Sequence, residues 1–182
     1  MSRFASAMGT HAPAGERHLD PEARLQHARD VAWRSLNRRD RTEAELRIAL
    51  DAKRVEPRLI DAVIGELIEG GYVDDARYAQ RFAEDRRRLD GWGAERIERR
   101  LRGLGVDVEP VEAALAERDA EAEREAALAL LARRFPRPAD GEWPASPQER
   151  DRALGVLVRK GYAPELAYDA LRRHAGVARQ LD

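Results

Sequence analysis

The sequence predicts an all-α protein built as an elongated tandem array of three three-helix repeats, each resembling a helix-turn-helix unit. Three observations lead to this prediction. Apolar residues recur with the 3.6-residue period of a helix, and the strict alternation that is typical of strands is absent. Helix start and stop signals flank the apolar stretches. One pattern of apolar residues and chain breaks occurs three times within the 182 residues.

The threefold pattern is visible when Leu50, Leu101 and Leu157 are placed in register, at spacings of 51 and 56 residues. Matching positions are Leu46, Ile97 and Ala153 before the anchor, Arg54, Gly105 and Gly161 at a break, and Ile60, Val111 and Ala167 in the next helix. A glycine at two of the three breaks suits a left-handed helix end, because glycine adopts that conformation at the lowest cost. Each unit therefore consists of a longer helix, a short helix, a tight break and a third helix.

The first three-helix unit is expected over residues 20–71. Asp20-Pro21 has the form of an N-cap followed by proline at the first helical position. Thr42 to Glu45 is a capping-box pattern for the second helix. The third helix is expected to begin near Pro57 and to end at Gly70-Gly71, after one broad apolar stripe.

The second unit is expected over residues 72–118 and the third over residues 119–176. Asp74-Asp75 lies where the first helix of the second unit should begin, so the pair is interpreted as a helix cap and not as a catalytic acid and base. The third unit contains a proline-rich loop at 135–147, near a second capping pattern that starts at Ser146.

The two ends of the chain carry no periodic apolar pattern. Residues 1–19 are predicted to be a disordered N-terminal tail, and residues 177–182 a C-terminal tail. Each unit of about 50 residues is too small to bury a large core alone, so stacking on neighbours should add stability.

The composition excludes several classes of function. The chain has no cysteine, which rules out disulfides, thiolate metal sites and a cysteine nucleophile. Its four histidines show no zinc-binding spacing, and no phosphate-binding glycine loop occurs. No apolar run reaches the roughly 18 to 20 residues that span a bilayer, and the N-terminus lacks the apolar core of a signal peptide. We therefore expect a non-enzymatic cytoplasmic protein without a cofactor or a metal.

Charge is unevenly distributed although the net charge is only −1. Residues 86–102 carry seven arginines and three acids, a balance of +4, whereas residues 107–125 carry eight acids and two arginines, a balance of −6. A second basic group lies at residues 38–41. Arginines near a helix C-terminus gain from the helix dipole, and they also suit an acidic partner. Trp92 next to these arginines is interpreted as a packing residue between units, and Glu121, Glu123 and Glu125 as a solvated helix face.

Four segments, in order, resemble the RecX family of regulators. Arg38–Leu46 is similar to the signature R-[RD]-x-[ST]-x-x-E-L, Gly71–Ala79 to G-Y-[IVL]-[DN]-D-x-[RK]-[YF]-A, Gly91–Val106 to G-x-G-x-x-R-I-x-x-x-L-x-x-x-G-[IV], and Arg159–Glu165 to R-[RK]-G-[FY]-x-x-[ED]. The resemblance extends from about residue 22 to residue 175. The chain departs from the pattern at Arg100, where family members usually carry glutamate, and in its longer proline-rich loop.

The resemblance implies a regulator of the RecA recombinase that binds in the groove of the RecA–single-stranded DNA filament. The sequence does not show the oligomeric state, and a monomer is the simplest expectation. Such a protein limits filament extension, ATP hydrolysis and strand exchange, and single-stranded DNA within the filament is an open second contact. We expect ten arginines to be the candidate contacts with the filament or DNA. They are Arg38, Arg39, Arg41, Arg86, Arg87, Arg88, Arg96, Arg99, Arg100 and Arg102.

Two other functions stay open at the level of sequence. The first is a direct DNA-binding module, since short helix pairs resemble helix-turn-helix units that enter the major groove. The helices that would read DNA are poorly suited to it: 57–69 has Arg58 as its only basic residue, and 107–118 is strongly acidic. The second alternative is a helical-repeat scaffold for a different protein partner.

Overall fold

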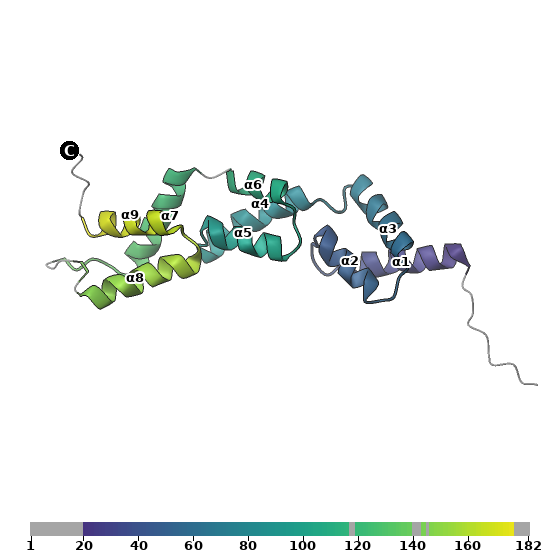
Figure 1. The fold of residues 1–182 in the computed structure, drawn as a ribbon, viewed down its shortest axis with the longest axis horizontal. Coiled ribbons are helices and arrows are strands. Elements are labelled where there is room, and N and C mark those ends of the chain that lie inside the picture. Colours follow the sequence, from purple (N-terminus) through teal and green to yellow (C-terminus); the bar gives the residue numbers. More distant parts are fainter. Residues whose placement is uncertain (1–19, 117–118, 140–142, 145, 177–182) are drawn as a thin grey trace, which may run out of the picture.

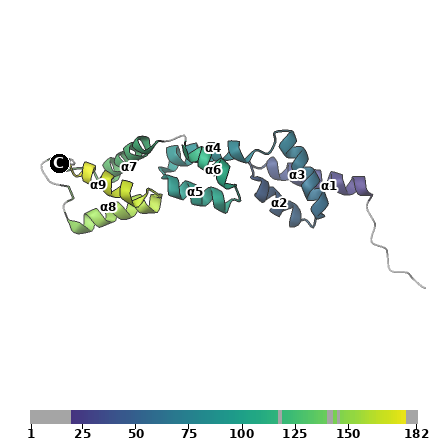
Figure 2. The same ribbon diagram turned by 45° about the horizontal axis from the view of Figure 1, so that its top comes forward.

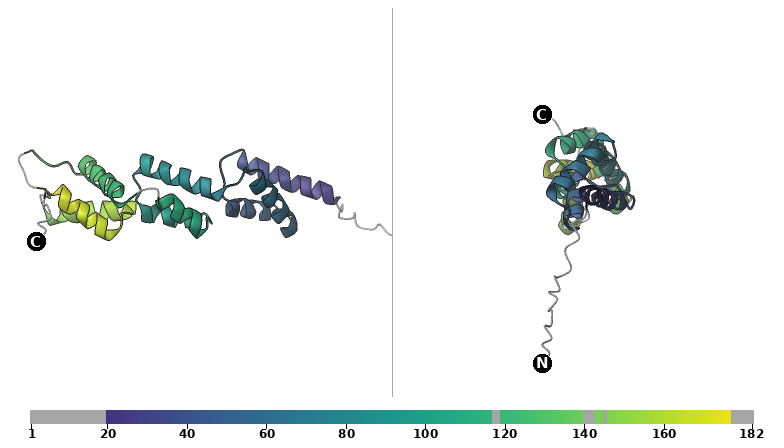
Figure 3. Two further views of the ribbon diagram at one scale, coloured as in Figure 1. Left: turned by 90° about the horizontal axis from the view of Figure 1, so that it is seen from above. Right: turned by 90° about the vertical axis from the view of Figure 1, so that its right-hand side faces the viewer.

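The computed structural model describes residues 20–116, 119–139, 143–144 and 146–176. Over these residues it contains nine α-helices, one π-helical turn and no β-strand, which confirms the predicted all-α class. The helices form three successive groups along one long axis, so the molecule is an elongated array (Figure 1). The groups stay separate in the turned view of Figure 2 and from above in Figure 3. None of the helices in these ranges combines the length and apolar character that crossing a membrane needs.

The first group has the caps and the apolar stripe that the sequence predicts. Its helices are α1 (Pro21–Leu36), α2 (Glu43–Asp51) and α3 (Pro57–Glu69). The Thr42 hydroxyl accepts a hydrogen bond from the Glu45 N–H, and the Glu45 carboxylate accepts one from the Thr42 N–H, which confirms the capping box. Val73, two residues beyond the expected end of this unit, also packs into the first core.

The second group contains an irregular turn between its first two helices. It consists of α4 (Asp75–Asp85), the π-helical turn η1 (Arg86–Asp90), α5 (Ala94–Gly103) and α6 (Val108–Ala116). The Asp74 side chain accepts a hydrogen bond from the Arg77 N–H, so the interpretation of Asp74 as a helix cap is confirmed.

The third group consists of α7 (Ala120–Arg134), α8 (Pro147–Lys160) and α9 (Pro164–His174). Ser146 caps α8 by accepting a hydrogen bond from the Glu149 N–H. The tails expected at 1–19 and 177–182 lie outside the described residues, as do positions 140–142 and 145 of the proline-rich loop.

Each group has its own hydrophobic core, and the predicted anchors lie at the centres of these cores. Leu50, Leu101 and Leu157 are fully buried, each in a different cluster. The positions four residues earlier, Leu46, Ile97 and Ala153, are fully buried as well. Because the three cores are separate, the groups are connected to one another by contacts outside these cores.

Polar contacts between backbone and side chains connect the first and second groups. At this first joint, the start of α2 meets the break that follows α5. The buried Thr42 hydroxyl donates to the carbonyl of Leu104 at 2.7 Å, while the Glu43 N–H donates to the Asp75 carboxylate at 2.9 Å. One hydroxyl thus caps its own helix and binds the next unit.

The second joint resembles the first, with Gly93 in the place of Thr42 and Lys160 in the place of Leu104. Here the start of α5 meets the break that follows α8. The Gly93 N–H donates to the carbonyl of Lys160 at 2.8 Å, and the Ala94 N–H donates to the Glu123 carboxylate at 2.7 Å. Glu123 is therefore a joint residue, and its interpretation as part of a solvated face was wrong. Carboxylates suit both places because a helix N-terminus carries unpaired N–H groups and a positive partial charge.

Glycines let the backbones approach at both joints. Gly105 and Gly161 have φ of 81° and 87°, in the left-handed region that glycine favours. A Cβ atom at Gly105 would lie 2.3 Å from the Ala44 Cβ, and one at Gly161 would lie 2.3 Å from the Arg96 Cβ. Each of these glycines therefore has two roles: it forms the break between two helices, and it contacts the preceding unit.

Candidate functional site

In the first basic group, between α1 and α2, two of the three arginines form internal ion pairs. Arg39 donates two hydrogen bonds to the Glu45 carboxylate, at 2.5 and 3.1 Å, and Arg41 lies 3.6 Å from the same carboxylate. Arg38 is exposed, and its side chain makes no hydrogen bond or ion pair with any described residue. Of these three candidates, Arg38 is the one whose charge is free for a partner.

The arrangement around Glu45 also fixes the charge of that carboxyl group. Burial by itself would raise the pKa of Glu45, but hydrogen bonds from Arg39 and the Thr42 N–H, together with the charges of Arg39 and Arg41, bring it below its ordinary value. Glu45 therefore stays ionised to lower pH than an exposed glutamate. It holds two of the predicted partner-binding arginines in place.

The arginines of the π-helical turn have three different roles. Arg86 forms a 2.6 Å ion pair with Asp90, and Arg87 donates to the carbonyls of Ala114 and Leu115 at 3.3 and 3.4 Å, near the end of α6. Arg88 is exposed and forms a 3.2 Å pair with Asp85, which at such exposure contributes little. Arg86 and Arg87 thus support the second unit, whereas Arg88 presents its charge to solvent.

The arginines of α5 divide in the same way. Arg96 donates to the carbonyl of Arg159 at 2.9 Å, across the second joint, and Arg102 donates to the carbonyl of Val106 at 3.0 Å. Arg99 and Arg100 are exposed and form no hydrogen bond or ion pair with a described residue. Arg100, the position that departs from the family pattern, therefore adds a free positive charge to the second unit.

Trp92 is a packing residue, and its contacts with described residues lie within the second unit and not between units as predicted. Its half-buried ring packs on the core of the second unit, and the Arg96 guanidinium lies 4.2 Å from the ring centre. The neighbouring Gly91 carbonyl accepts a hydrogen bond from the Tyr162 hydroxyl of the third unit at 3.3 Å. These contacts fix the orientation of Arg96.

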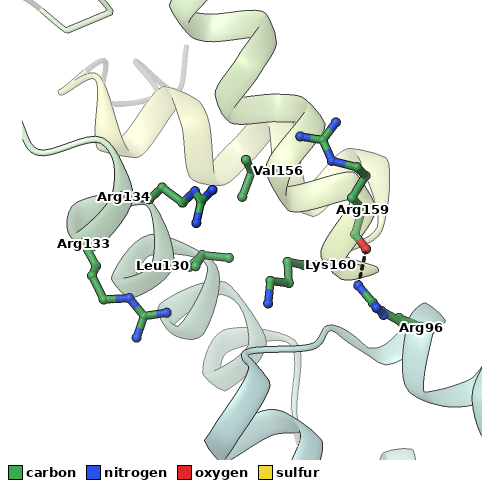
Figure 4. A pocket seen from close by; sticks show the side chains of 7 residues that line it. All are labelled: Arg96, Leu130, Arg133, Arg134, Val156, Arg159 and Lys160. Carbon is green, nitrogen blue, oxygen red and sulfur yellow. Dashed lines mark hydrogen bonds between the residues drawn. The ribbon is translucent and has the colours of Figure 1, made fainter.

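The structure brings Arg96 together with four basic residues that the sequence reasoning did not select. They are Arg133 and Arg134 at the end of α7, and Arg159 and Lys160 at the end of α8. With Leu130 and Val156 they line a hollow of about 660 Å³ (Figure 4). Two adjacent basic pairs in the last turns of two helices of one unit were the signal in the sequence. A further hollow of about 550 Å³ at the first joint brings Arg41 and Arg102 together.

A metal centre or an acid-base pair is not suggested by the described part of the chain. Groups of three or more histidine, aspartate or glutamate side chains that could hold a metal ion do not occur among the described residues. The candidate site is therefore a set of basic surfaces along the array.

Comparisons with known proteins connect these surfaces to one family. Residues 28–67 match the sequence pattern described as RecX, first three-helix domain, and residues 74–115 match RecX, second three-helix domain. The regulatory protein RecX of Mycolicibacterium smegmatis is 36% identical over 161 residues, which cover 87% of this chain and 85% of that protein. The RecX protein of Deinococcus radiodurans is 33% identical over 174 residues, covering 90% of this chain and 79% of its own length.

Solved structures show the same fold. The crystal structure of RecX from Lactobacillus salivarius superposes with a TM-score of 0.71 at 19% identity, covering 83% of this chain and 96% of that one. A second crystal structure, of a regulatory protein RecX, gives a TM-score of 0.68 at 19% identity over 84% of this chain and 73% of that one.

Proposed function

This chain belongs to the RecX family, and from that premise we propose that it is a non-catalytic regulator of the RecA recombinase. It lies in the groove of the RecA–single-stranded DNA filament, contacts neighbouring RecA protomers, and limits filament extension, ATP hydrolysis and strand exchange. It acts in the cytoplasm, in homologous recombination and DNA repair. The relatives from Mycolicibacterium smegmatis and Deinococcus radiodurans are named regulatory proteins, which supports a regulatory role.

The observation that carries the proposal is the repeated joint. Equivalent positions, Thr42 and Gly93, bind the carbonyls of Leu104 and Lys160 in the next unit, so the three units continue in one direction as an extended array. An extended array fits a long groove better than a single pocket does. It spreads modest contacts over several units, and connecting them raises the overall affinity without a strong individual site.

The free charges of the array support contact with an acidic surface. Arg38, Arg88, Arg99 and Arg100 are exposed, and three of them form no hydrogen bond or ion pair with a described residue. Exposed charges attract an acidic partner over a distance and give an association that weakens as salt is added. Whether these residues contact RecA or the DNA strand is part of the proposal.

The proposal is tested by ATP hydrolysis of the RecA protein from the same organism on single-stranded DNA, with this chain titrated in. We expect inhibition well below one copy per RecA. The variant Arg88→Ala/Arg99→Ala/Arg100→Ala should inhibit much less, since it removes three exposed charges without disturbing a joint. Its matched control is Arg58→Ala/Arg137→Ala/Arg152→Ala, which removes three other exposed arginines.

The outcome that contradicts the proposal is an unchanged rate of ATP hydrolysis at excess protein. Pulldown of a different protein would then favour the scaffold hypothesis. The structure gives little support to duplex reading by α6, which carries Glu109 and Glu112 and no basic residue in Val108–Ala116. Tight, sequence-dependent binding in a DNA gel shift at moderate salt would revive that alternative.

A further inference from the structure

A basic cleft lies at the second joint, between α7 and α8 of the third unit and the start of α5. We use the name for the hollow lined by Arg96, Leu130, Arg133, Arg134, Val156, Arg159 and Lys160. Its volume of about 660 Å³ falls in the range of small-molecule sites. In Figure 4 the Arg134 side chain extends toward Val156, and Lys160 extends into the space between α8 and Leu130.

The positive charges of the basic cleft are largely uncompensated. Five of its seven lining residues are cationic, and no carboxylate is among the seven. The guanidinium groups of Arg133, Arg134 and Arg159 form no ion pair with any residue in the described ranges. Lys160 donates to the Asp90 carbonyl at 2.5 Å, and Arg96 donates to the Arg159 carbonyl at 2.9 Å, so neither of these has a neutralising partner there.

Helix dipoles explain why cations occur at the ends of α7 and α8, but not why both ends meet at one hollow. A cation in the last helical turn gains a small amount of stability from the helix dipole when it is exposed. That gain is local to each helix and would be the same if the two ends pointed apart. Gathering five like charges around a hollow costs electrostatic free energy, which a multiply charged anion would recover.

Phosphate is the anion that these side chains suit best. The planar fork of arginine donates two parallel hydrogen bonds to phosphate oxygens, and a lysine ammonium acts as a point charge beside them. Several such donors around one hollow suit consecutive phosphate groups more than a lone anion. We propose that the basic cleft binds a ligand that carries several phosphate groups. Both a nucleoside polyphosphate and the backbone of a single strand of nucleic acid present this chemistry.

Occupation of the basic cleft would also stiffen the array. Arg96 belongs to the second unit, whereas Arg133, Arg134 and Lys160 belong to the third. A ligand held by both sets bridges the second joint, next to the hydrogen bond from the Gly93 N–H to Lys160. Binding therefore stabilises one relative orientation of these two units.

The test is isothermal titration calorimetry of the full chain with two probes, sodium tripolyphosphate and an oligothymidylate of about 12 nucleotides. Salt of about 0.1 M suppresses attraction beyond roughly 10 Å. Arg133→Ala/Arg134→Ala should bind at least about tenfold more weakly than wild type, since the loss of a single charge-assisted hydrogen bond already weakens binding by about that factor. Arg58→Ala/Arg152→Ala removes the same charge elsewhere and should bind within about twofold of wild type.

The outcomes separate the two sources of phosphate. Binding of tripolyphosphate without competition by the oligonucleotide indicates a nucleoside polyphosphate or free polyphosphate, whereas tighter binding of the oligonucleotide indicates a strand backbone. Lack of binding by both probes overturns the proposal, as does equal binding by wild type and Arg133→Ala/Arg134→Ala. Citrate binding as tightly as tripolyphosphate overturns the preference for phosphate. RecA is absent from this experiment, so its result is independent of the ATP hydrolysis assay.

Discussion

The close approach at the second joint makes Gly93→Ala a sharp test of how the units are held together. Gly93 has φ −83° and ψ 170°, which alanine adopts without strain, so the substitution tests the space and not the backbone conformation. An added Cβ atom would lie 2.4 Å from the Gly161 oxygen and 2.7 Å from the Tyr162 nitrogen. Both are backbone atoms and cannot rotate away, so the third unit has to move by about 1 Å to restore ordinary contact.

The expected loss of unfolding free energy follows from the hydrogen bonds that such a movement breaks. Gly93 and Glu95 donate their N–H groups to the carbonyls of Lys160 and Gly161, at 2.8 and 3.1 Å. A net contribution of about 1 kcal/mol for each bond gives a loss of about 2 kcal/mol. For a chain of this size, 1 kcal/mol corresponds to about 2 to 4 °C in melting temperature, so we expect a decrease of about 4 to 8 °C.

Thermal unfolding followed by far-ultraviolet circular dichroism measures this decrease, with Gly65→Ala as the matched control. No heavy atom lies within 4 Å of a Cβ built at Gly65, inside α3, so alanine fits there. Its better helix propensity should raise the melting temperature slightly. If Gly93→Ala melts with the wild type while Gly65→Ala behaves as expected, the second joint is not a close backbone contact and the reasoning fails.

Three further predictions concern single residues. Leu101→Ala should cost about 2 to 5 kcal/mol of unfolding free energy in urea, because this side chain is fully buried; a cost below about 1 kcal/mol would contradict its role as a core anchor. Arg54→Gly should raise the unfolding free energy by up to about 1 kcal/mol, because Arg54 has φ 58° in the region that disfavours side chains; a decrease would show that the arginine side chain is needed there. Asp75→Asn should become more stabilising relative to wild type as the pH rises above the ordinary aspartate pKa of about 4. Burial, and then the nearby charges of Glu43, Asp107 and Asp74, raise the pKa of Asp75. The wild-type protein therefore loses stability as the pH rises through that pKa, and the variant does not. Urea midpoints of the two proteins that shift in parallel with pH would refute this.

Local signals were sufficient to predict the helices and their cores. The anchors Leu50, Leu101 and Leu157 belong to apolar patterns with the period of a helix, which places the apolar side chains of each pattern on one helix face. All three anchors are buried. The caps at Thr42 and Asp74 depend on side chains within three residues of the helix start, so a short stretch of sequence contains all the information.

The joints could not be predicted in full, because several of their acceptors are backbone carbonyls, and the two carboxylate acceptors, Asp75 and Glu123, have the sequence pattern of ordinary acids in a first helical turn. Leu104 and Lys160 accept hydrogen bonds through oxygens that every residue type possesses, so no residue identity marks them. The same limit applies to the basic cleft. Arg133 and Lys160 are 27 positions apart in the sequence, and only the packing of both α7 and α8 on α9 makes them line one hollow. Charge counting along the chain therefore selected Arg87, which supports α6, and missed Arg133.

The residue before each second helix reflects whether another unit docks on it. Thr42 has a side chain that caps α2 and also reaches the Leu104 carbonyl. Gly93 occupies the equivalent place where the next backbone comes too close for any side chain, and its own N–H makes the contact instead.

The same reasoning applies at the two ends of the array. Ser146 caps α8 in the ordinary way, and no fourth unit follows it among the described residues. At the other end, the break of the first unit carries Arg54 with a positive φ, where the two later breaks carry glycine. Both glycines contact a preceding unit, whereas no unit precedes Arg54 among the described residues, so the requirement for glycine at these breaks arises from docking and not from the turn alone. Glycine at a break therefore marks the two joints of the described array, at Gly105 and Gly161.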